Sequence, residues 1–203
     1  MSLNNEDFAY AIQKKYLKNK KIRAYKVGAS NKSSQNFFNT SSIIIGGIEE
    51  KNIYKNIIKK DYPIAELEIA VKVQYDSIAK TKTRILNKYI AIECPHSDIE
   101  NKEGSKFICI ADNCSSGDLI LLKKINEIDL KQFNLTISEG ENKLNIDADI
   151  SRLVYPIEAI INQTIDLIER HKLPFHEELY ISTGGISNIF SLKKSNTLSL
   201  DCK

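Results

Sequence analysis

The sequence predicts an α+β fold, in which a mixed β-sheet forms a roll or barrel and helices flank it. Short apolar segments of strand length recur along the chain, whereas only two segments have the clear periodicity of amphipathic helices. No internal repeat, low-complexity linker or change in composition marks a second domain. We therefore expect residues 1–203 to form a single domain, with an N-terminal helix of about residues 5–19 packed on it.

The two helices are predicted from the spacing of their apolar residues. In 5–19, Phe8, Ile12 and Tyr16 recur at four-residue intervals, and an asparagine at the start offers a cap. In 156–171, a proline suits the first helical position and cationic residues occupy the last turn. The apolar stripe of this second helix consists of Ile157, Ile160, Ile161, Ile165 and Ile168.

The other apolar segments predict strands. We expect these strands over 22–28, 41–48, 64–74, 88–94, 107–111, 119–123, 134–139, 143–146 and 177–182. A hairpin turn is expected over 139–142, and a short helix over 78–87. The polar segment 31–40 is consistent with either a short helix or a loop over a site, and 52–60 is ambiguous.

Composition limits the classes of function. The net charge is only +3 and the lysines are scattered, so nothing favours a nucleic acid or an anionic membrane as partner. No apolar run reaches membrane-spanning length and no signal peptide is evident, so we expect a cytoplasmic protein. The four cysteines lack the spacing of a zinc site and are expected to be free thiols, namely Cys94, Cys109, Cys114 and Cys202.

Two carboxylates interrupt the apolar run 64–71. Glu66 and Glu68 are two residues apart, so in a strand their side chains project to the same face. Two like charges in an apolar setting are unfavourable unless a cation holds them, and a hard divalent cation prefers carboxylate oxygen. A third glutamate, Glu93, interrupts the similar segment 89–93.

This spacing does not decide the matter alone. Random order would place about three acid-x-acid triplets in a chain with this many Asp and Glu residues, and others do occur, such as Asp98-Ile99-Glu100 and Asp147-Ala148-Asp149. From the pattern alone, a half-exposed strand that turns its polar face to water is the favoured explanation of Glu66 and Glu68.

Seven short motifs follow one another along the chain. They are Ala-Tyr-Ala-Ile-Gln from Ala9, Tyr-Lys-Val-Gly-Ala-Ser from Tyr25, Glu-Leu-Glu-Ile-Ala from Glu66, Ala-Ile-Glu from Ala91, Ala-Asp-Asn-Cys-Ser-Ser-Gly from Ala111, Tyr-Pro from Tyr155 and Ser-Thr-Gly-Gly from Ser182. In type and order they resemble the 2-hydroxypenta-2,4-dienoate hydratase (2-keto-4-pentenoate hydratase) and 4-oxalocrotonate decarboxylase group of the fumarylacetoacetate hydrolase superfamily. The resemblance covers about residues 8–192 and implies a roll or barrel of the fumarylacetoacetate hydrolase C-terminal-domain type.

The resemblance also implies a metal site and its neighbours. The three carboxylate ligands for Mg²⁺ or Mn²⁺ fall on Glu66, Glu68 and Glu93. Lys26 matches the active-site lysine, which binds the substrate carboxylate or transfers a proton. Ser115 and Thr183 match polar site positions in glycine-rich turns, although residue types alone would make both loop hydroxyls and Lys26 a solvated strand lysine.

Two segments depart from the family pattern. The segment 31–48 contains no Asp or Glu, whereas the hydratases carry an acidic residue in about this region. After Glu93, the segment 94–98 has an unfamiliar sequence that includes His96, which is either an acid/base group or a surface histidine. The pocket wall and its proton-transfer groups are therefore expected to differ.

Three functions remain open at this stage. The first is a metal-dependent lyase, a hydratase or decarboxylase, that acts on a small 2-oxo or 2-hydroxydienoic acid. The second is a degenerate, non-catalytic homologue that binds a small acid or serves as a partner subunit. The third is an acylpyruvate C–C hydrolase, which ranks lower because no histidine precedes the Glu-x-Glu strand. The resemblance further implies a homo-oligomer, with a hetero-complex with a related enzyme as the other possibility.

Overall fold

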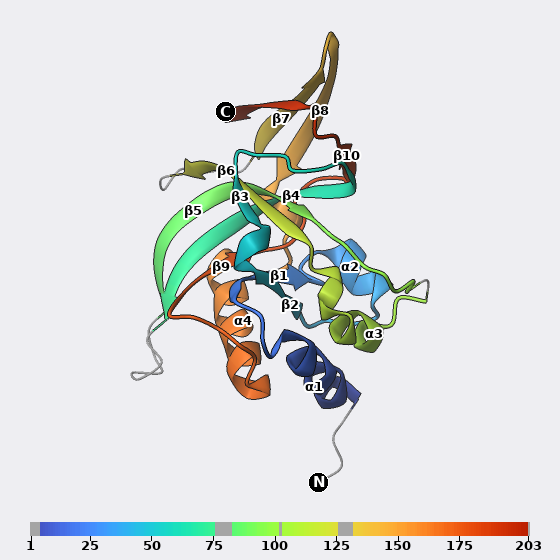
Figure 1. Ribbon diagram of the computed structural model, residues 1–203, viewed down its shortest axis with the longest axis vertical. Helices are drawn as coiled ribbons and strands as arrows, with labels where there is room; N and C mark the ends of the chain where they lie inside the picture. The colour runs from blue at the N-terminus through green and yellow to red at the C-terminus, as the bar shows by residue number, and fades with distance from the viewer. Residues whose placement is uncertain (1–4, 76–82, 102, 126–131, 203) are drawn as a thin grey trace.

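A curved mixed sheet organises the chain (Figure 1). The computed structural model describes residues 5–75, 83–101, 103–125 and 132–202. The helices are α1 (Asn5–Leu17), α2 (Lys32–Phe37), α3 (Lys106–Ala111) and α4 (Ile157–His171), and the short 3₁₀ turns are η1 (Glu50–Asn52), η2 (Asn113–Ser115) and η3 (Ile150–Arg152). The strands are β1 (Ile22–Gly28), β2 (Ile44–Glu49), β3 (Ile53–Lys55), β4 (Tyr62–Tyr75), β5 (Thr83–Cys94), β6 (Asp118–Ile125), β7 (Gln132–Glu139), β8 (Asn142–Asp149), β9 (Glu178–Ser182), β10 (Phe190–Leu192) and β11 (Thr197–Cys202).

The main sheet has the strand order β2-β1-β9-β4-β5-β6-β3, and β10 pairs with β4 outside this path. The long strands β4 and β5 form an antiparallel pair that bends in an arc through the middle of the molecule (Figure 1). The β1–β9 and β3–β6 pairs are parallel, which makes the sheet mixed. A second, three-stranded sheet, β11-β7-β8, projects from the end of the molecule opposite to α1 (Figure 1). This is the α+β architecture that the sequence predicts.

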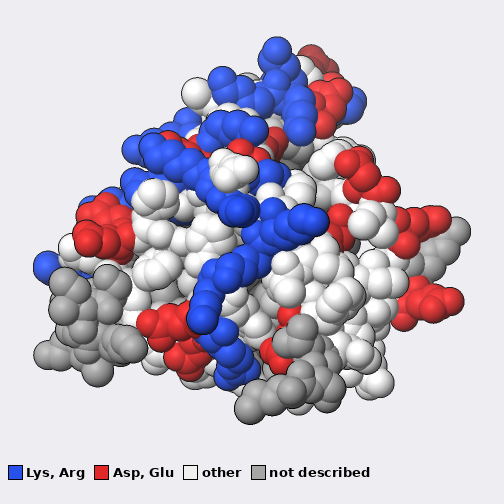
Figure 2. Space-filling view, turned by 60° about the horizontal axis from the view of Figure 1, so that its bottom comes forward, with Lys and Arg blue, Asp and Glu red and all other residues white. Residues whose placement is uncertain are grey.

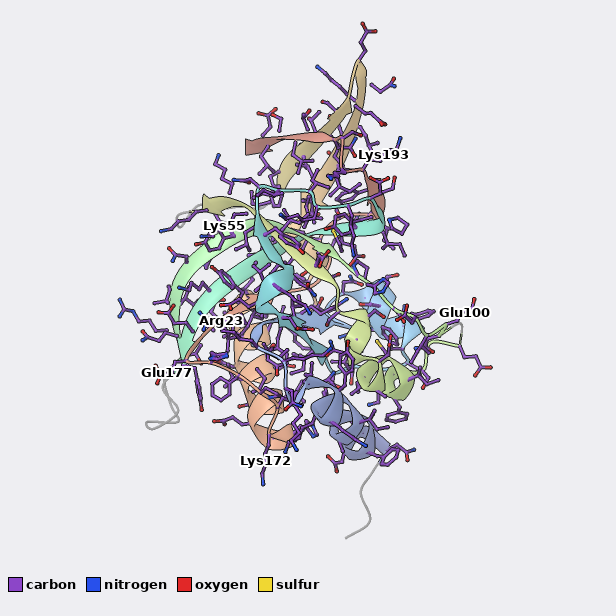
Figure 3. The ribbon with its side chains drawn as sticks, viewed as in Figure 1. Arg23, Lys55, Glu100, Lys172, Glu177 and Lys193 are labelled. Carbon is purple, nitrogen blue, oxygen red and sulfur yellow. The ribbon has the colours of Figure 1, made fainter. Side chains whose placement is uncertain are left out.

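Helix α4 packs its isoleucine stripe into the main core. Ile160, Ile161, Ile165 and Ile168 are buried, as the spacing predicts. Pro156 is the cap rather than the first helical residue, and its carbonyl accepts the first helical hydrogen bond from Ile160 N. Lys172 ends the helix in the left-handed conformation, and its side chain extends away from the body (Figure 3).

Helix α1 forms as expected but presents its other face to the core. Phe8, Ile12 and Tyr16 are exposed, whereas Tyr10 is fully buried. Gln13 explains this orientation, because its amide donates to two backbone carbonyls in the interior, at Ile45 and Ile110. The apolar stripe of this helix therefore lies on the surface.

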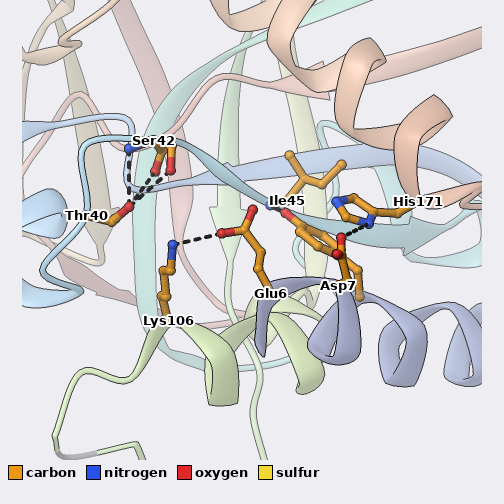
Figure 4. Close-up of polar contacts among 8 residues, drawn as sticks. Glu6, Asp7, Thr40, Ser42, Ile45, Lys106 and His171 are labelled. Carbon is orange, nitrogen blue, oxygen red and sulfur yellow. Dashed lines mark hydrogen bonds and ion pairs between the residues drawn. The ribbon is translucent and has the colours of Figure 1, made fainter. Parts of the chain in front are cut away.

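An ion pair and a histidine–carboxylate contact hold the start of α1 against the body (Figure 4). Lys106 Nζ lies 2.8 Å from Glu6 Oε2, and His171 Nδ1 lies 3.7 Å from Asp7 Oδ1. The imidazole of His171 also stacks on the ring of Tyr10 at 4.0 Å between centroids. These contacts join α1 to α3 and α4.

Two predictions of secondary structure were wrong. Residues 107–111 form helix α3 instead of a strand, because Ser105 caps the segment and its hydroxyl accepts a hydrogen bond from Ile108 N at 3.4 Å. The predicted helix over 78–87 lies partly outside the described residues, and from Thr83 onward the chain is strand β5 paired with β4. Short apolar segments do not distinguish a strand from a helix by periodicity.

The hairpin of β7 and β8 turns at Gly140, as predicted, with a positive φ of 60°. Lys193, which follows β10, contacts the carboxylate of Glu139 at this turn, with Nζ 2.8 Å from Oε2 (Figure 3). Strands β3, β10 and β11 were not predicted. All three are short or polar, so their sequences carry no clear alternation.

The described cysteines are buried free thiols, as predicted for Cys94, Cys109 and Cys114. The side chain of Cys202 lies outside the described residues. On the face shown in Figure 2, lysine and arginine side chains form a band, and acidic side chains gather on both sides of it. No helix within the described ranges has the length and apolar character needed to cross a membrane.

Candidate metal centre and adjoining cavity

Strand pairing brings three glutamates together. Glu66 and Glu68 share one face of β4, and the antiparallel register places Glu66 opposite Glu93 on β5. One carboxylate oxygen from each of the three lies within 4.8 Å of the others. Within the described part of the chain, this is the one cluster of Cys, His, Asp or Glu side chains with the spacing of a metal site.

The carboxylates are buried and only partly satisfied. Glu68 is 1% exposed and Glu93 is fully buried. Glu68 Oε2 accepts hydrogen bonds from the Ser182 hydroxyl and from Gly184 N at 3.0 Å. Glu93 Oε1, in contrast, is buried and has no hydrogen-bond partner among the described residues. A buried carboxylate oxygen without a partner is costly, so this position favours a cation.

Among the described residues, Lys26 is the one cation that forms an ion pair with the cluster. Its ammonium nitrogen lies 3.3 Å from Glu93 Oε2, and the lysine is held on β1 opposite Ser182 of β9. Burial by itself lowers the pKa of Lys26, but the charges of Glu93, Glu68 and Glu66 outweigh it and hold the pKa above its ordinary value. Lys26 is therefore protonated while it faces the three carboxylates.

The pKa values of the three carboxyl groups are also raised, which favours their neutral form. Burial, followed by repulsion from Glu93, raises the pKa of Glu68 to about 8. Burial also raises the pKa of Glu93 to about 7, although Lys26 opposes the rise. The pKa of Glu66 is raised by burial, and the charges of Lys26 and Arg152 counteract part of this. Without a further cation, the cluster thus retains protons near neutral pH.

These observations fit a divalent cation. When all four groups are ionised, the three carboxylates and one ammonium leave two negative charges, which a divalent cation neutralises. Carboxylate oxygens are the ligands that Mg²⁺, Mn²⁺ and Ca²⁺ prefer. Glu66, Glu68 and Glu93 would hold such an ion, and the unpartnered oxygen of Glu93 would gain a ligand bond.

The turn after β9 lies close against the cluster. Gly184 has a φ of +100°, a conformation that residues with a side chain rarely adopt. The hydroxyl of Ser30 occupies the space that a Cβ atom at this residue would need. A Cβ atom at Gly185 would lie 2.8 Å from Glu66 Oε2. The two glycines of this turn therefore let the backbone approach the carboxylates closely.

A cavity of about 740 Å³ opens beside the cluster. Glu66 is its half-buried carboxylate, and Arg152 and Lys32 are exposed cations in the same lining. The rest of the lining comes from the polar residues Asn31, Ser33, Ser34, Ser151, Ser187 and Asn188 and from the apolar residues Phe37 and Ile189. The volume suits a small polar molecule in contact with the carboxylate cluster.

Comparisons with known proteins agree with this geometry. No family model and no curated protein sequence matches the chain. Among solved structures, 4-oxalocrotonate decarboxylase from Pseudomonas putida G7, complexed with magnesium and adipate, has a TM-score of 0.72 at 16% identity, over 95% of this chain and 80% of that one. This chain has the fold of 4-oxalocrotonate decarboxylase.

Two other similar structures extend the comparison. Cg1458 has a TM-score of 0.56 at 11% identity, over 88% of this chain and 70% of that one. The 2-keto-3-deoxy-D-arabinonate dehydratase complexed with magnesium and 2,5-dioxopentanoate has a TM-score of 0.50 at 11% identity, over 88% and 72% of the two chains. The predicted fold of the fumarylacetoacetate hydrolase C-terminal-domain type is thereby confirmed.

Thr183 lies between two residues that contact the cluster, but its own side chain forms no hydrogen bond with the described residues. The residue is fully buried, its backbone N–H donates to Ile69 O, and its hydroxyl has no partner among the described residues. Its neighbours Ser182 and Gly184 contact Glu68 instead. The alternation of side chains along β9 is the sequence signal that could have identified Ser182, and not Thr183, as the residue that contacts Glu68.

Ser115 is not in the lining of the cavity formed by the described residues. It lies on η2 with a positive φ of 53°, and its backbone carbonyl accepts a hydrogen bond from His96 N at 2.8 Å. It therefore supports the segment 94–98. His96 is itself exposed, lies 3.6 Å from Asp98 and does not line the cavity.

The segment 31–40 contains a short helix, which is one of the two structures predicted for it, and this helix lines the cavity. The helix is α2, whose cap Asn31 accepts a hydrogen bond from Ser34 N and donates to Gly185 O at 3.2 Å. This wall carries Lys32 and hydroxyl groups but no carboxylate. Arg152, which the sequence did not single out, completes the cationic side of the lining.

Proposed function

We propose that this protein is a divalent-metal-dependent lyase, a hydratase or a decarboxylase, that acts on a small 2-oxo or 2-hydroxydienoic acid. The observation that carries the proposal is the convergence of three glutamates and Lys26 on β4, β5 and β1, beside a cavity of substrate size. The buried Glu93 Oε1, which has no hydrogen-bond partner among the described residues, supports the proposal, because a cation would give this oxygen a ligand bond.

The chain's own residues have distinct roles in this proposal. Glu66, Glu68 and Glu93 hold Mg²⁺ or Mn²⁺, which when bound polarises the 2-oxo group of the substrate as a Lewis acid. Lys26 stays protonated and either binds the substrate carboxylate or delivers a proton from Nζ. Ser182 and Gly184 N orient Glu68, and Gly185 leaves room for Glu66.

The neighbours in fold support this class of reaction. One is a decarboxylase complexed with magnesium and adipate, and another is a dehydratase complexed with magnesium and 2,5-dioxopentanoate. Both pair a divalent cation with a small acid or oxo compound. The choice between hydration and decarboxylation rests on the cavity wall, which differs here from the family pattern.

The test is a turnover screen of 2-oxo and 2-hydroxydienoic acids with Mg²⁺ or Mn²⁺, and with a chelator as the metal-free control. Wild-type protein should turn over at least one acid only when the metal is present. Glu66→Gln should abolish turnover, whereas Glu141→Gln on the exposed β7–β8 turn should leave it unchanged. Unchanged turnover in Glu66→Gln would contradict the metal role.

One observation favours a second candidate, a non-catalytic homologue that binds a small acid. The α2 wall of the cavity offers no carboxylate for proton transfer, and Lys26 is the only cation in contact with the cluster among the described residues. Metal binding measured by calorimetry, together with no turnover of any acid in the screen, would support this candidate. Metal-dependent turnover would exclude it.

The acylpyruvate hydrolase remains a lower alternative. Such a reaction needs a base that activates water, and no histidine lines the cavity formed by the described residues. His171 stacks on Tyr10 and contacts Asp7, both of which belong to α1, and it does not line the cavity.

A further inference from the structure

Two of the buried cysteines lie together where α3 ends. Cys109 belongs to α3 and Cys114 to η2, and a hydrogen bond joins their thiol groups. Three successive residues have a positive φ, which is uncommon without glycine, namely Asn113 (55°), Cys114 (52°) and Ser115 (53°). They turn the chain back after the helix. The function proposed above assigns no role to either thiol.

The cysteine pair is coupled to Lys26 through β2. In the β1–β2 register, Lys26 lies opposite Gly46. A Cβ atom at Gly46 would lie 2.0 Å from Asn113 O and 2.3 Å from Ser116 Oγ, so the turn that contains Cys114 packs directly on this glycine. The charge of Lys26 also acts on both thiols. A movement of the turn would therefore reach the lysine at the carboxylate cluster.

Side-chain hydrogen bonds hold the turn against β2. The amide of Asn113 pairs with the backbone of Gly47, because Oδ1 accepts from Gly47 N at 2.7 Å and Nδ2 donates to Gly47 O at 2.8 Å. The thiol of Cys114 donates to Ile45 O at 3.0 Å. A disulfide at Cys114 would remove the thiol proton and this hydrogen bond, and so loosen the turn from the strand beside Lys26.

The two thiols differ in reactivity. The hydrogen bond from Cys114 lowers the pKa of Cys109 below its ordinary value, with help from the charge of Lys26 and against the effect of burial. Burial instead raises the pKa of Cys114. Cys109 is also the more exposed of the two, at 8% against 2%. Because the thiolate is the nucleophile, Cys109 is the sulfur that attacks an oxidant, and Cys114 is the resolving thiol.

We propose that Cys109 and Cys114 form a redox-active dithiol, which a hydroperoxide converts into an intramolecular disulfide that slows turnover. The Cys109 thiolate attacks the terminal peroxide oxygen, the O–O bond breaks, and Cys109 becomes a sulfenic acid while the leaving oxygen takes up a proton. The Cys114 sulfur then attacks the Cys109 sulfur, and the sulfenic hydroxyl leaves as water with the Cys114 proton. The two sulfurs together lose two electrons, which reduce the peroxide. The effect on turnover rests on the proposed function, whereas formation of the disulfide does not.

Peptide mapping after treatment with hydrogen peroxide tests the proposal. Cleavage after Lys106 and Lys123 releases 107–123, a single peptide that contains both cysteines. In peroxide-treated wild-type protein, this peptide should resist alkylation and be lighter by two hydrogens, while Cys94 remains open to alkylation after unfolding. Metal-dependent turnover should fall about tenfold or more, because Lys26 loses its alignment. A thiol reductant should restore it.

Three serine variants sharpen the result. Cys109→Ser removes the attacking sulfur, so this variant should form no disulfide and should keep its turnover in peroxide. Cys114→Ser retains a hydroxyl that can donate to Ile45 O, and it should form no disulfide either. Cys94→Ser is the matched control, because it removes a buried free thiol on β5 outside the pair. It should keep both the disulfide and the response to peroxide.

The outcomes separate this inference from the function proposed above. A wild-type peptide 107–123 that stays open to alkylation after peroxide treatment would overturn the inference, and so would unchanged turnover of the disulfide form. An equal loss of turnover in wild type and Cys109→Ser would also overturn it, since the oxidation would then act elsewhere. Absence of turnover in the reduced protein would overturn the proposed function, and the peptide map would still decide whether the disulfide forms. That map needs only wild-type protein, so it is decisive even where a variant fails to fold by circular dichroism.

Discussion

The floor and the wall of the cavity follow different principles. The floor is the cluster of Glu66, Glu68, Glu93 and Lys26, of which Glu66 lines the cavity, and all four stand on paired strands of one sheet. The wall comes from α2, η3 and the turn before β10, which meet through single hydrogen bonds between loops. Strand register fixes which side chains of the floor face one another, because a shift of one residue would turn them to the other face of the sheet. The side chains of the wall, in contrast, can change without disturbing the sheet. In the proposed function, the floor therefore determines the class of reaction and the wall determines the choice of substrate.

The largest effect in the floor is expected from Lys26→Met. This change removes the only cation in contact with the cluster among the described residues, and the proposed proton donor with it. Turnover should fall about 100-fold or more, while metal binding persists because no ligand is lost. Steady-state kinetics and metal calorimetry would measure the two properties separately.

Lys72→Gln is the matched control, because Lys72 pairs with Glu178 near the surface of the same sheet. Its turnover should remain close to wild type. If Lys26→Met also kept wild-type turnover, Lys26 would be a structural counter-charge only.

The pH dependence of stability without metal should expose the buried carboxylates. The folded-state pKa values of Glu68 and Glu93 lie above their ordinary value of 4.5, so the folded protein retains protons that the unfolded chain releases. Stability is thus fully present below pH 4.5 and is lost as the pH rises through about 7 to 8. In chelator, the Tm should fall by about 5 °C or more between pH 5.5 and pH 8.

Saturating Mg²⁺ should reduce this fall, because the ion stabilises the ionised carboxylates and binds only the folded protein. Glu68→Gln should reduce it as well, since the variant has one fewer buried ionisable group. A Tm that rises with pH in chelator, or a fall of equal size with and without Mg²⁺, would contradict the assigned burial of charge.

A smaller effect is expected from Gly185→Ala. The new Cβ would displace Glu66 Oε2, which lies at the end of a flexible side chain, so the stability should change little. Metal affinity should fall about tenfold, because one ligand loses its alignment. Calorimetry with Mn²⁺ would measure the affinity, and thermal unfolding would measure the stability. An unchanged affinity would show that Glu66 has room to move without cost.

The smallest effect is expected at a residue outside both the floor and the wall. His96 is exposed, pairs with Asp98 and lies outside the cavity lining, so His96→Gln should change turnover by less than about twofold. The same kinetic assay would measure it. A loss comparable to that of Lys26→Met would return His96 to the role of an acid/base group.

The sequence was sufficient for the floor because its signals are local or follow strand alternation. Glu66 and Glu68 are two residues apart in one strand, and Glu93 follows from the antiparallel partner. Arg152 was not predicted, because its place beside the cavity depends on hydrogen bonds to Ser30 and Ile186, which are distant in sequence. No local pattern carries that information.

The errors in secondary structure have related causes. The apolar run 107–111 is compatible with a strand or a helix, and the cap at Ser105 decides for the helix. In α1, the apolar residues Phe8 and Tyr16 suggested the wrong buried face, because the polar side chain of Gln13 is satisfied by carbonyls in the core. Periodicity identifies a helix, but tertiary hydrogen bonds select the face that it buries.

The central claim is that the three glutamates form a divalent metal site. Titration of Mn²⁺ into metal-free protein, followed by calorimetry, tests it most directly. Wild-type protein and Glu141→Gln should each bind one ion per chain, and Glu93→Gln should lose this binding while it remains folded by circular dichroism. Equal Mn²⁺ affinity in wild type and Glu93→Gln would contradict the account.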